Sequence, residues 1–171
     1  AEMHYDRVRV AGVDFATSVG DFGVHGEVAH TWTVGRRDDS YLQYAFGFDY
    51  TFADVRPGQN LRLVVEYAGV HVTQEGQRAG GLPAIRVDRE LDGAWLVKAT
   101  YEFSEVLKAE LKLAADLKGA DNYYVQPTVT YDVTESLRLK AGADLLGGAR
   151  RTLFGRFSDN DRFFIALDYY F

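Results

Sequence analysis

Several residue types and patterns are scarce in this chain of 171 residues, and each scarcity narrows the class of protein. Cysteine is absent, which excludes disulfide scaffolds, thiolate metal sites and cysteine nucleophiles. No run of about 18 apolar residues occurs, so the sequence predicts no transmembrane helix. A membrane β-barrel is still compatible with this sequence, because barrel strands alternate apolar and polar residues. The net charge of -6 gives no sign of a basic surface for nucleic acid, so nucleic acid is not expected as a partner.

Aromatic residues, by contrast, are abundant, and many recur at every second position. The chain has 11 Tyr and 11 Phe but one Met, a balance that suits sheets and membrane-interface belts better than a helical core. The clearest case is the last segment, which places on one face Phe163, Ile165, Leu167, Tyr169 and Phe171. Because successive side chains of a strand point to opposite faces, this strand has one apolar and one charged side.

The same two-faced pattern repeats along the whole chain. Alternating segments lie at 13–19, 22–34, 42–52, 61–67, 95–103, 107–117, 123–131, 137–145 and 163–171. They predict about nine antiparallel strands in one domain over 1–171, with no helix required. The connections are expected to alternate between short and long, with a break over 53–60 on the short side and long outer loops at 74–93 and 147–160. The segment 3–10 is too irregular to settle whether it forms another strand.

Aromatic residues cluster near both ends of the predicted strands. They form two belts separated by Val, Leu and Ala, as expected where amphipathic rings sit at the two membrane interfaces. The interface residues predicted in this way are Trp32, Tyr50, Phe52, Trp95, Tyr101, Phe103, Tyr131, Tyr169 and Phe171. The alternative is a soluble β-sandwich or lipocalin-like barrel with the rings inside, but so many rings would overfill a small barrel.

The opposite face of these strands carries charges of both signs. The residues predicted to line a lumen are Glu27, Asp49, Arg62, Glu66, Lys98, Glu102, Lys108, Glu110, Lys112, Asp116, Arg138, Lys140, Asp144, Arg162 and Asp168. In a closed barrel of roughly eight to ten strands these side chains would fill the interior as a plug, and in one of roughly sixteen strands they would line a water-filled channel. The strand number therefore decides between plug and pore.

Five short motifs resemble the C-terminal half of large porin-like outer-membrane proteins of Gram-negative bacteria. They are VDFAT at 13–17, GDFG at 20–23, LQY at 42–44, GFDY at 47–50 and FGRF at 154–157, and the resemblance covers most of the chain. It implies an all-β, antiparallel, up-and-down transmembrane barrel of about 8–10 strands, or the C-terminal section of a larger barrel. The terminal aromatic Phe171 is similar to the signal read by the barrel-assembly machinery. The implied location is the outer membrane, in contact with lipid and lipopolysaccharide.

Two functions follow from these expectations. The first is a channel for small hydrophilic solutes, with this chain forming all or part of the barrel wall. Because an odd count of nine strands is unusual for such barrels, further strands or chains are expected to complete it. The alternative is a small closed barrel with a structural or surface-binding role, as an adhesin or a lipopolysaccharide contact, through arginines of the outer loops.

No enzyme, metal or cofactor is predicted from the sequence. No serine has a histidine and an acid in a recognisable order. His25 and Glu27 share a face but lack a third ligand at metal spacing, and Asp159, Asn160 and Asp161 lack the rest of a calcium loop. We therefore expect no catalytic residues in this chain.

Overall fold

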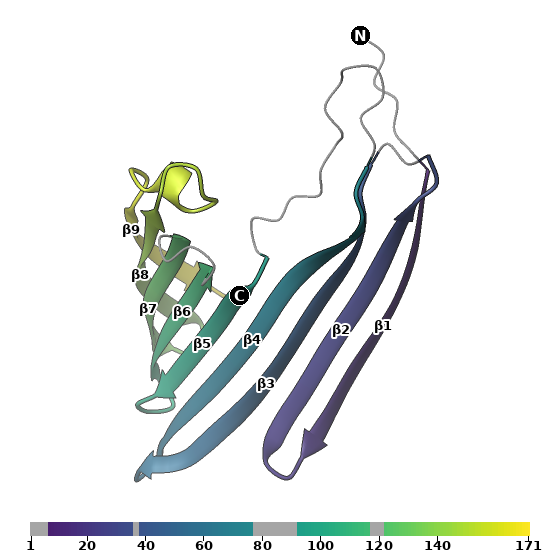
Figure 1. The fold of residues 1–171 in the computed structure, drawn as a ribbon. Helices are drawn as coiled ribbons and strands as arrows, with labels where there is room; N and C mark the ends of the chain where they lie inside the picture. Colours follow the sequence, from purple (N-terminus) through teal and green to yellow (C-terminus); the bar gives the residue numbers. More distant parts are fainter. Residues whose placement is uncertain (1–6, 36–37, 77–91, 117–121) are drawn as a thin grey trace.

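The fold is a single antiparallel sheet of nine strands in sequence order (Figure 1). A computed structural model describes residues 7–35, 38–76, 92–116 and 122–171. The strands are β1 (Val8–Val19), β2 (Phe22–Thr33), β3 (Ser40–Arg56), β4 (Gln59–Gln74), β5 (Ala94–Glu102), β6 (Leu107–Asp116), β7 (Asn122–Thr134), β8 (Leu137–Gly148) and β9 (Arg162–Tyr169). The predicted all-β, up-and-down architecture is confirmed. The expectation of no helix misses one short turn of 3-10 helix, η1 (Gly155–Phe157).

The sheet is open. Strands β1 and β9 form its two edges, and within the described residues no pairing joins them. The expectation that these strands close on themselves as a small barrel is therefore not met by the sheet as it stands. Among the described residues, no helix has both the length and the apolar character needed to cross a membrane.

Short and long connections fall at opposite ends of the sheet. Strands at one end are joined by 20–21, 57–58, 103–106 and 135–136, and at the other by 34–39, 75–93, 117–121 and 149–161. The predicted long loops at 74–93 and 147–160 thus correspond to connections at one end, although 77–91 lies outside the described residues. We call the two ends the turn end and the loop end. Strand β9 finishes at the turn end.

The predicted break over 53–60 is wrong. Strand β3 continues to Arg56 and β4 begins at Gln59, so only Pro57 and Gly58 form the turn, with Gly58 at a φ of 72°. A register shift between Phe52 and Arg56 interrupts the alternation, and Asp54 adopts a φ of 51°. Three residues of β3 (53–55) lie opposite the single residue Asn60 of β4, so the irregularity adds two residues to β3 without ending the pairing. For this reason the alternation pattern placed the end of the strand too early.

The first strand also begins earlier than its pattern indicates. Val8 pairs with Thr33, and the β1–β2 ladder runs without a shift from there to Val19. Arg9 occupies the face that the later strands fill with apolar residues, which blurred the pattern at this end. Within the segment 3–10, Val8 to Val10 therefore extend β1, and residues 3–6 lie outside the described residues.

Cross-strand pairing joins the alternate faces of the strands into two continuous surfaces. Phe48, for example, pairs with Val24 on one side and Val65 on the other. Because directly paired residues point to the same side of a sheet, the apolar flanks of all nine strands form one surface, here called the apolar face. The charged flanks form the other, here called the polar face.

The sheet curves with the polar face inside. On this face Thr128, Thr130 and Asp144 are 5%, 7% and 5% exposed although no second sheet lies over them in the described part of the chain, whereas on the apolar face Leu111 and Val129 are 45% and 48% exposed. Side chains crowd together on the inside of a curved sheet and spread apart on the outside. Figure 1 shows the matching curl, with β6 to β9 turned away from the plane of β1 to β4.

Candidate functional site

All fifteen residues predicted to line a lumen lie on the polar face. The register aligns them in rows across the strands, for example Glu102 with Lys108, and Arg138 with Asp168. The concave polar face is therefore the candidate functional site.

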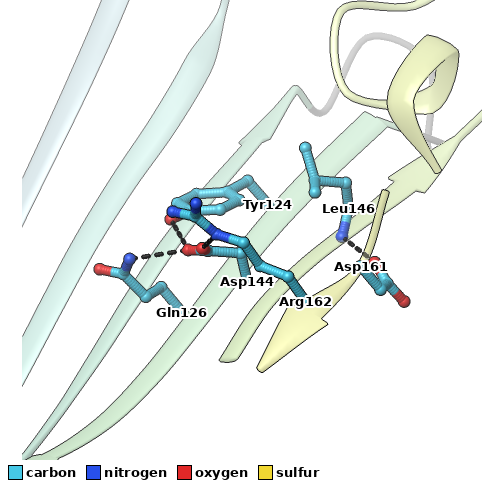
Figure 2. A network of polar contacts seen from close by, with 6 residues as sticks. All are labelled: Tyr124, Gln126, Asp144, Leu146, Asp161 and Arg162. Atoms are coloured by element: carbon cyan, nitrogen blue, oxygen red, sulfur yellow. Dashed lines mark hydrogen bonds and ion pairs between the residues drawn. The ribbon is translucent and has the colours of Figure 1, made fainter. Parts of the chain in front are cut away.

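The most enclosed group among these residues is the carboxylate of Asp144 on β8 (Figure 2). Its Oδ1 accepts hydrogen bonds from the Tyr124 hydroxyl at 2.5 Å and from the Gln126 amide at 2.7 Å. Its Oδ2 accepts one from the Arg162 guanidinium. Since Tyr124 and Gln126 belong to β7 and Arg162 to β9, this carboxylate ties together three strands.

Beside this cluster, the connection 149–161 folds against the polar face at the loop end. The ring of Phe154 stacks on Tyr124 with centroids 5.7 Å apart, and the Phe154 N–H donates to the side chain of Asn122 at 2.9 Å. Asp161 accepts a hydrogen bond from the Leu146 N–H at 2.8 Å (Figure 2). These contacts anchor the loop on β7 and β8, over one side of the concave surface.

A second cluster joins β5 and β6 in the middle of the sheet. Glu110 lies between two ammonium groups, 2.9 Å from Lys98 and 3.3 Å from Lys112. Its side chain is 23% exposed, and those of the two lysines are about twice as open. The carboxylate is thus held inward while both cations extend toward the space above the polar face.

On the other half of the sheet, His25 and Glu66 meet across a strand. His25 on β2 and Glu66 on β4 form a hydrogen bond of 2.8 Å above Gly47 of β3. A Cβ at position 47 would lie 2.5 Å from the imidazole, so the bridge requires glycine at this point. Arg62 and Asp49 form a further ion pair of 3.1 Å nearby.

Near the turn end, Arg138 on β8 forms a two-point contact with Asp132 on β7, at 2.5 and 3.2 Å. Asn60 donates to Glu102 at 3.3 Å in the same region. Charges of both signs therefore extend along the whole polar face. In the described residues, no group of three or more His, Cys, Asp or Glu is arranged to hold a metal ion.

Sequence reasoning missed several members of these clusters. Tyr124, Gln126, Asp132 and Asn60 were not among the predicted site residues. Each lies at an alternate position on the polar side of its strand, so the period-two pattern contained the signal. The prediction counted formal charges along each strand and passed over neutral hydrogen-bonding groups and Asp132.

The predicted interface aromatics gather on the apolar face. Neighbouring rings meet near the turn end in Tyr50 with Phe52 (4.6 Å), Tyr101 with Phe103 (4.7 Å) and Tyr169 with Phe171 (6.4 Å). Near the loop end, Trp95 lies 5.1 Å from Tyr67. Between the two belts, Phe15, Phe46 and Phe48 add rings that the simple two-belt prediction did not include.

The fold and its faces define an open, two-faced antiparallel meander. Comparison of the chain with protein-family models, with curated proteins and with solved structures finds no match. What this protein does must therefore be argued from its own geometry.

Proposed function

We propose that this chain forms part of the wall of a porin-like barrel through which small hydrophilic solutes cross an outer membrane of a Gram-negative bacterium. The observation that carries the proposal is the contrast between the two faces. The convex face bears large apolar side chains, such as Phe48 (41% exposed) and Val129 (48% exposed), with no protein layer over them in the described structure. Soluble monomers rarely leave so broad an apolar surface in water.

Lipid is the environment that fits the apolar face. Its strands are 8 to 17 residues long, against about 9 to 11 residues for a tilted membrane-spanning strand, and every strand is antiparallel to its neighbours. Aromatic belts near both ends match the two interfaces of a bilayer. The apolar face would thus contact outer-membrane lipid, with lipopolysaccharide near the loop end.

Water fits the polar face. The Lys98, Glu110 and Lys112 cluster and the Arg62 and Asp49 pair are partly exposed, as expected of groups that line a wet passage. An open nine-stranded sheet encloses no passage alone, so conduction belongs to the completed barrel. Insertion of that barrel would be the task of the barrel-assembly machinery.

Because residues 1–171 contain no cysteine, single cysteines introduced there allow a direct test with the complete assembled protein in planar bilayers, with the unsubstituted protein as the control for any cysteine elsewhere. Thr100 and Leu111 lie almost level, because Ala99 pairs with Leu111 and Thr100 with Glu110, but they face opposite sides. We expect stepwise conductance, and a change in its amplitude when a charged, membrane-impermeant thiol reagent reacts with Thr100→Cys. The matched Leu111→Cys variant should not respond. Absence of any conductance, or equal responses of both variants, contradicts the proposal.

A further inference from the structure

The two edge strands of the sheet, β1 and β9, have features that favour pairing with further strands. Strand β1 has 12 residues and β9 has 8, and neither contains proline or lysine. The ladders β1–β2 and β8–β9 also show no register shift. Natural proteins usually protect exposed edge strands with proline, lysine, bulges or a covering element, because unpaired N–H and C=O groups recruit further strands. These edges therefore lack proline, lysine and bulges, and the charged residues that they carry are Arg9 and Asp14 on β1 and Arg162 and Asp168 on β9.

Side chains on the edges lack lateral neighbours. On β9 the apolar face exposes Phe163 by 85% and Ile165 by 79%, against 38% for Leu139 on the adjacent β8. On β1 every residue is exposed, including those on the concave side. A strand beside each edge would cover these side chains and continue both faces of the sheet.

Strand direction restricts what that neighbour can be. In an up-and-down sheet successive strands reverse, so β1 and β9, both odd in order, run in the same direction. A strand between them can be antiparallel to both, and so can three or five strands, but an even number cannot. Two copies of this chain inserted the same way would have to pair β9 of one with β1 of the other in parallel, which breaks the antiparallel pattern of the whole sheet.

Curvature restricts the number further. Roughly eight strands are enough to close a small barrel, yet these nine remain open. Their curvature therefore fits a barrel with more strands than the chain supplies. Adding an odd number to nine gives an even total, as bacterial single-chain outer-membrane barrels have.

We infer that an odd number of further antiparallel strands, supplied by polypeptide other than a second copy of residues 1–171, pairs with the free edges of β1 and β9 and closes the barrel. The partner section must alternate apolar and polar residues in the same sense as this chain, because both faces of the sheet continue through its edges. This inference rests on the proposed function and specifies the partner that completes the same wall.

Disulfide trapping in the cysteine-free chain tests which strands meet. Val13→Cys on β1 is combined in turn with Phe163→Cys, Ile165→Cys or Leu167→Cys on β9, all on the apolar face. A disulfide needs Cα atoms roughly 4.4–6.8 Å apart, so only paired or adjacent strands react. The control pair is Ala141→Cys with Ile165→Cys, which are direct partners across β8 and β9 and should cross-link in every preparation.

We expect no disulfide between β1 and β9 in the complete protein from its membrane, either within one molecule or between two, because the further strands separate the two edges. We also expect that the β1 and β9 amides pointing away from the sheet are protected from hydrogen exchange in that preparation. A cross-link within one molecule, a cross-link between copies, or unprotected edge amides in the complete protein overturns the inference. Neither readout involves conductance, so its failure is distinct from failure of the proposed channel.

Discussion

A single carboxylate illustrates how the polar face is held at the level of individual residues. Asp144 accepts hydrogen bonds from β7 and β9 while its own strand lies between them, and it is 5% exposed. Its partner Arg162 is far more open, with 71% of its side chain exposed. The stabilising effect of this pair therefore comes mainly from satisfying enclosed polar groups, because an exposed guanidinium loses little when it returns to water.

From this geometry we predict that Asp144→Ala lowers the free energy of unfolding by about 1 to 3 kcal/mol, because the Tyr124 hydroxyl and the Gln126 amide lose their acceptor in a crowded surface. Urea titration of the protein refolded in phospholipid vesicles measures the change. The control, Asp159→Ala, removes an exposed loop carboxylate and should stay within about 0.5 kcal/mol. Equal losses in the two variants would contradict the role given to Asp144.

A second residue-scale prediction compares the two faces at matched depth. If the apolar face contacts hydrocarbon, Leu111→Arg should cost about 2 to 4 kcal/mol near the bilayer midplane. Thr100→Arg places the same charge on the polar face, opposite Glu110, and should cost clearly less. The same vesicle titration measures both. A larger loss for Thr100→Arg would reverse the assignment of inside and outside.

At the scale of elements, a glycine in one strand allows side chains of the two neighbouring strands to form a hydrogen bond above it. Gly47 of β3 lies beneath the bond between His25 of β2 and Glu66 of β4, and a Cβ there would approach the Glu66 Cγ to 2.7 Å. On the same strand and face, Ala45 borders a hollow of about 430 Å³ that also includes Gly12, Ala29 and Ala68. The room for a larger side chain on the polar face of β3 therefore differs sharply between Ala45 and Gly47.

We therefore expect Gly47→Val to break the His25 to Glu66 bond and to lower stability by about 1 to 3 kcal/mol through overpacking. Ala45→Val, with room beside it, is the matched control and should change stability much less. The penalty of Gly47→Val should shrink in a His25→Ala background, which a double-mutant cycle of urea titrations measures directly. An unchanged penalty in that background would mean that the strain lies elsewhere.

The alternation of apolar and polar residues predicted the strands well where the pairing has no register shift. It placed a strand end wrongly where extra residues on one strand shift the register. The bulge between Phe52 and Arg56 hid the end of β3, since it shifts the register without breaking the strand. The predicted strand over 123–131 does continue through Pro127, although Pro127 lacks an N–H and neither it nor Gln126 has a pairing partner on β8. There the Gln126 side chain bonds to Asp144 of β8. Such compensation depends on neighbouring strands and cannot be read from one segment.

For the whole molecule, the sequence predicted the two faces but not whether the sheet closes. The face of the sheet on which a side chain lies is a local property, because it follows from the position of the residue along its strand. Closure depends on the total number of strands and on their tilt and stagger, which no single segment determines. The first kind of reasoning placed the fifteen residues predicted to line a lumen on one face, and their role in a lumen stays a prediction. The distinction between a plugged and an open barrel requires the second kind of reasoning, which needs the total strand number, tilt and stagger.

The two tryptophans offer a final test of whether the apolar face of the whole sheet contacts lipid. Trp32 and Trp95 both lie on the apolar face toward the loop end and are 44% and 37% exposed. In the proposed orientation their rings sit at the membrane interface, so brominated lipids should quench their fluorescence most strongly when the bromine lies near the headgroup, and less when it lies at the midplane. The single-tryptophan variants Trp32→Phe and Trp95→Phe report each position separately. Strong quenching by aqueous iodide together with no quenching by any brominated lipid would place the apolar face outside the bilayer and remove the basis of the membrane assignment.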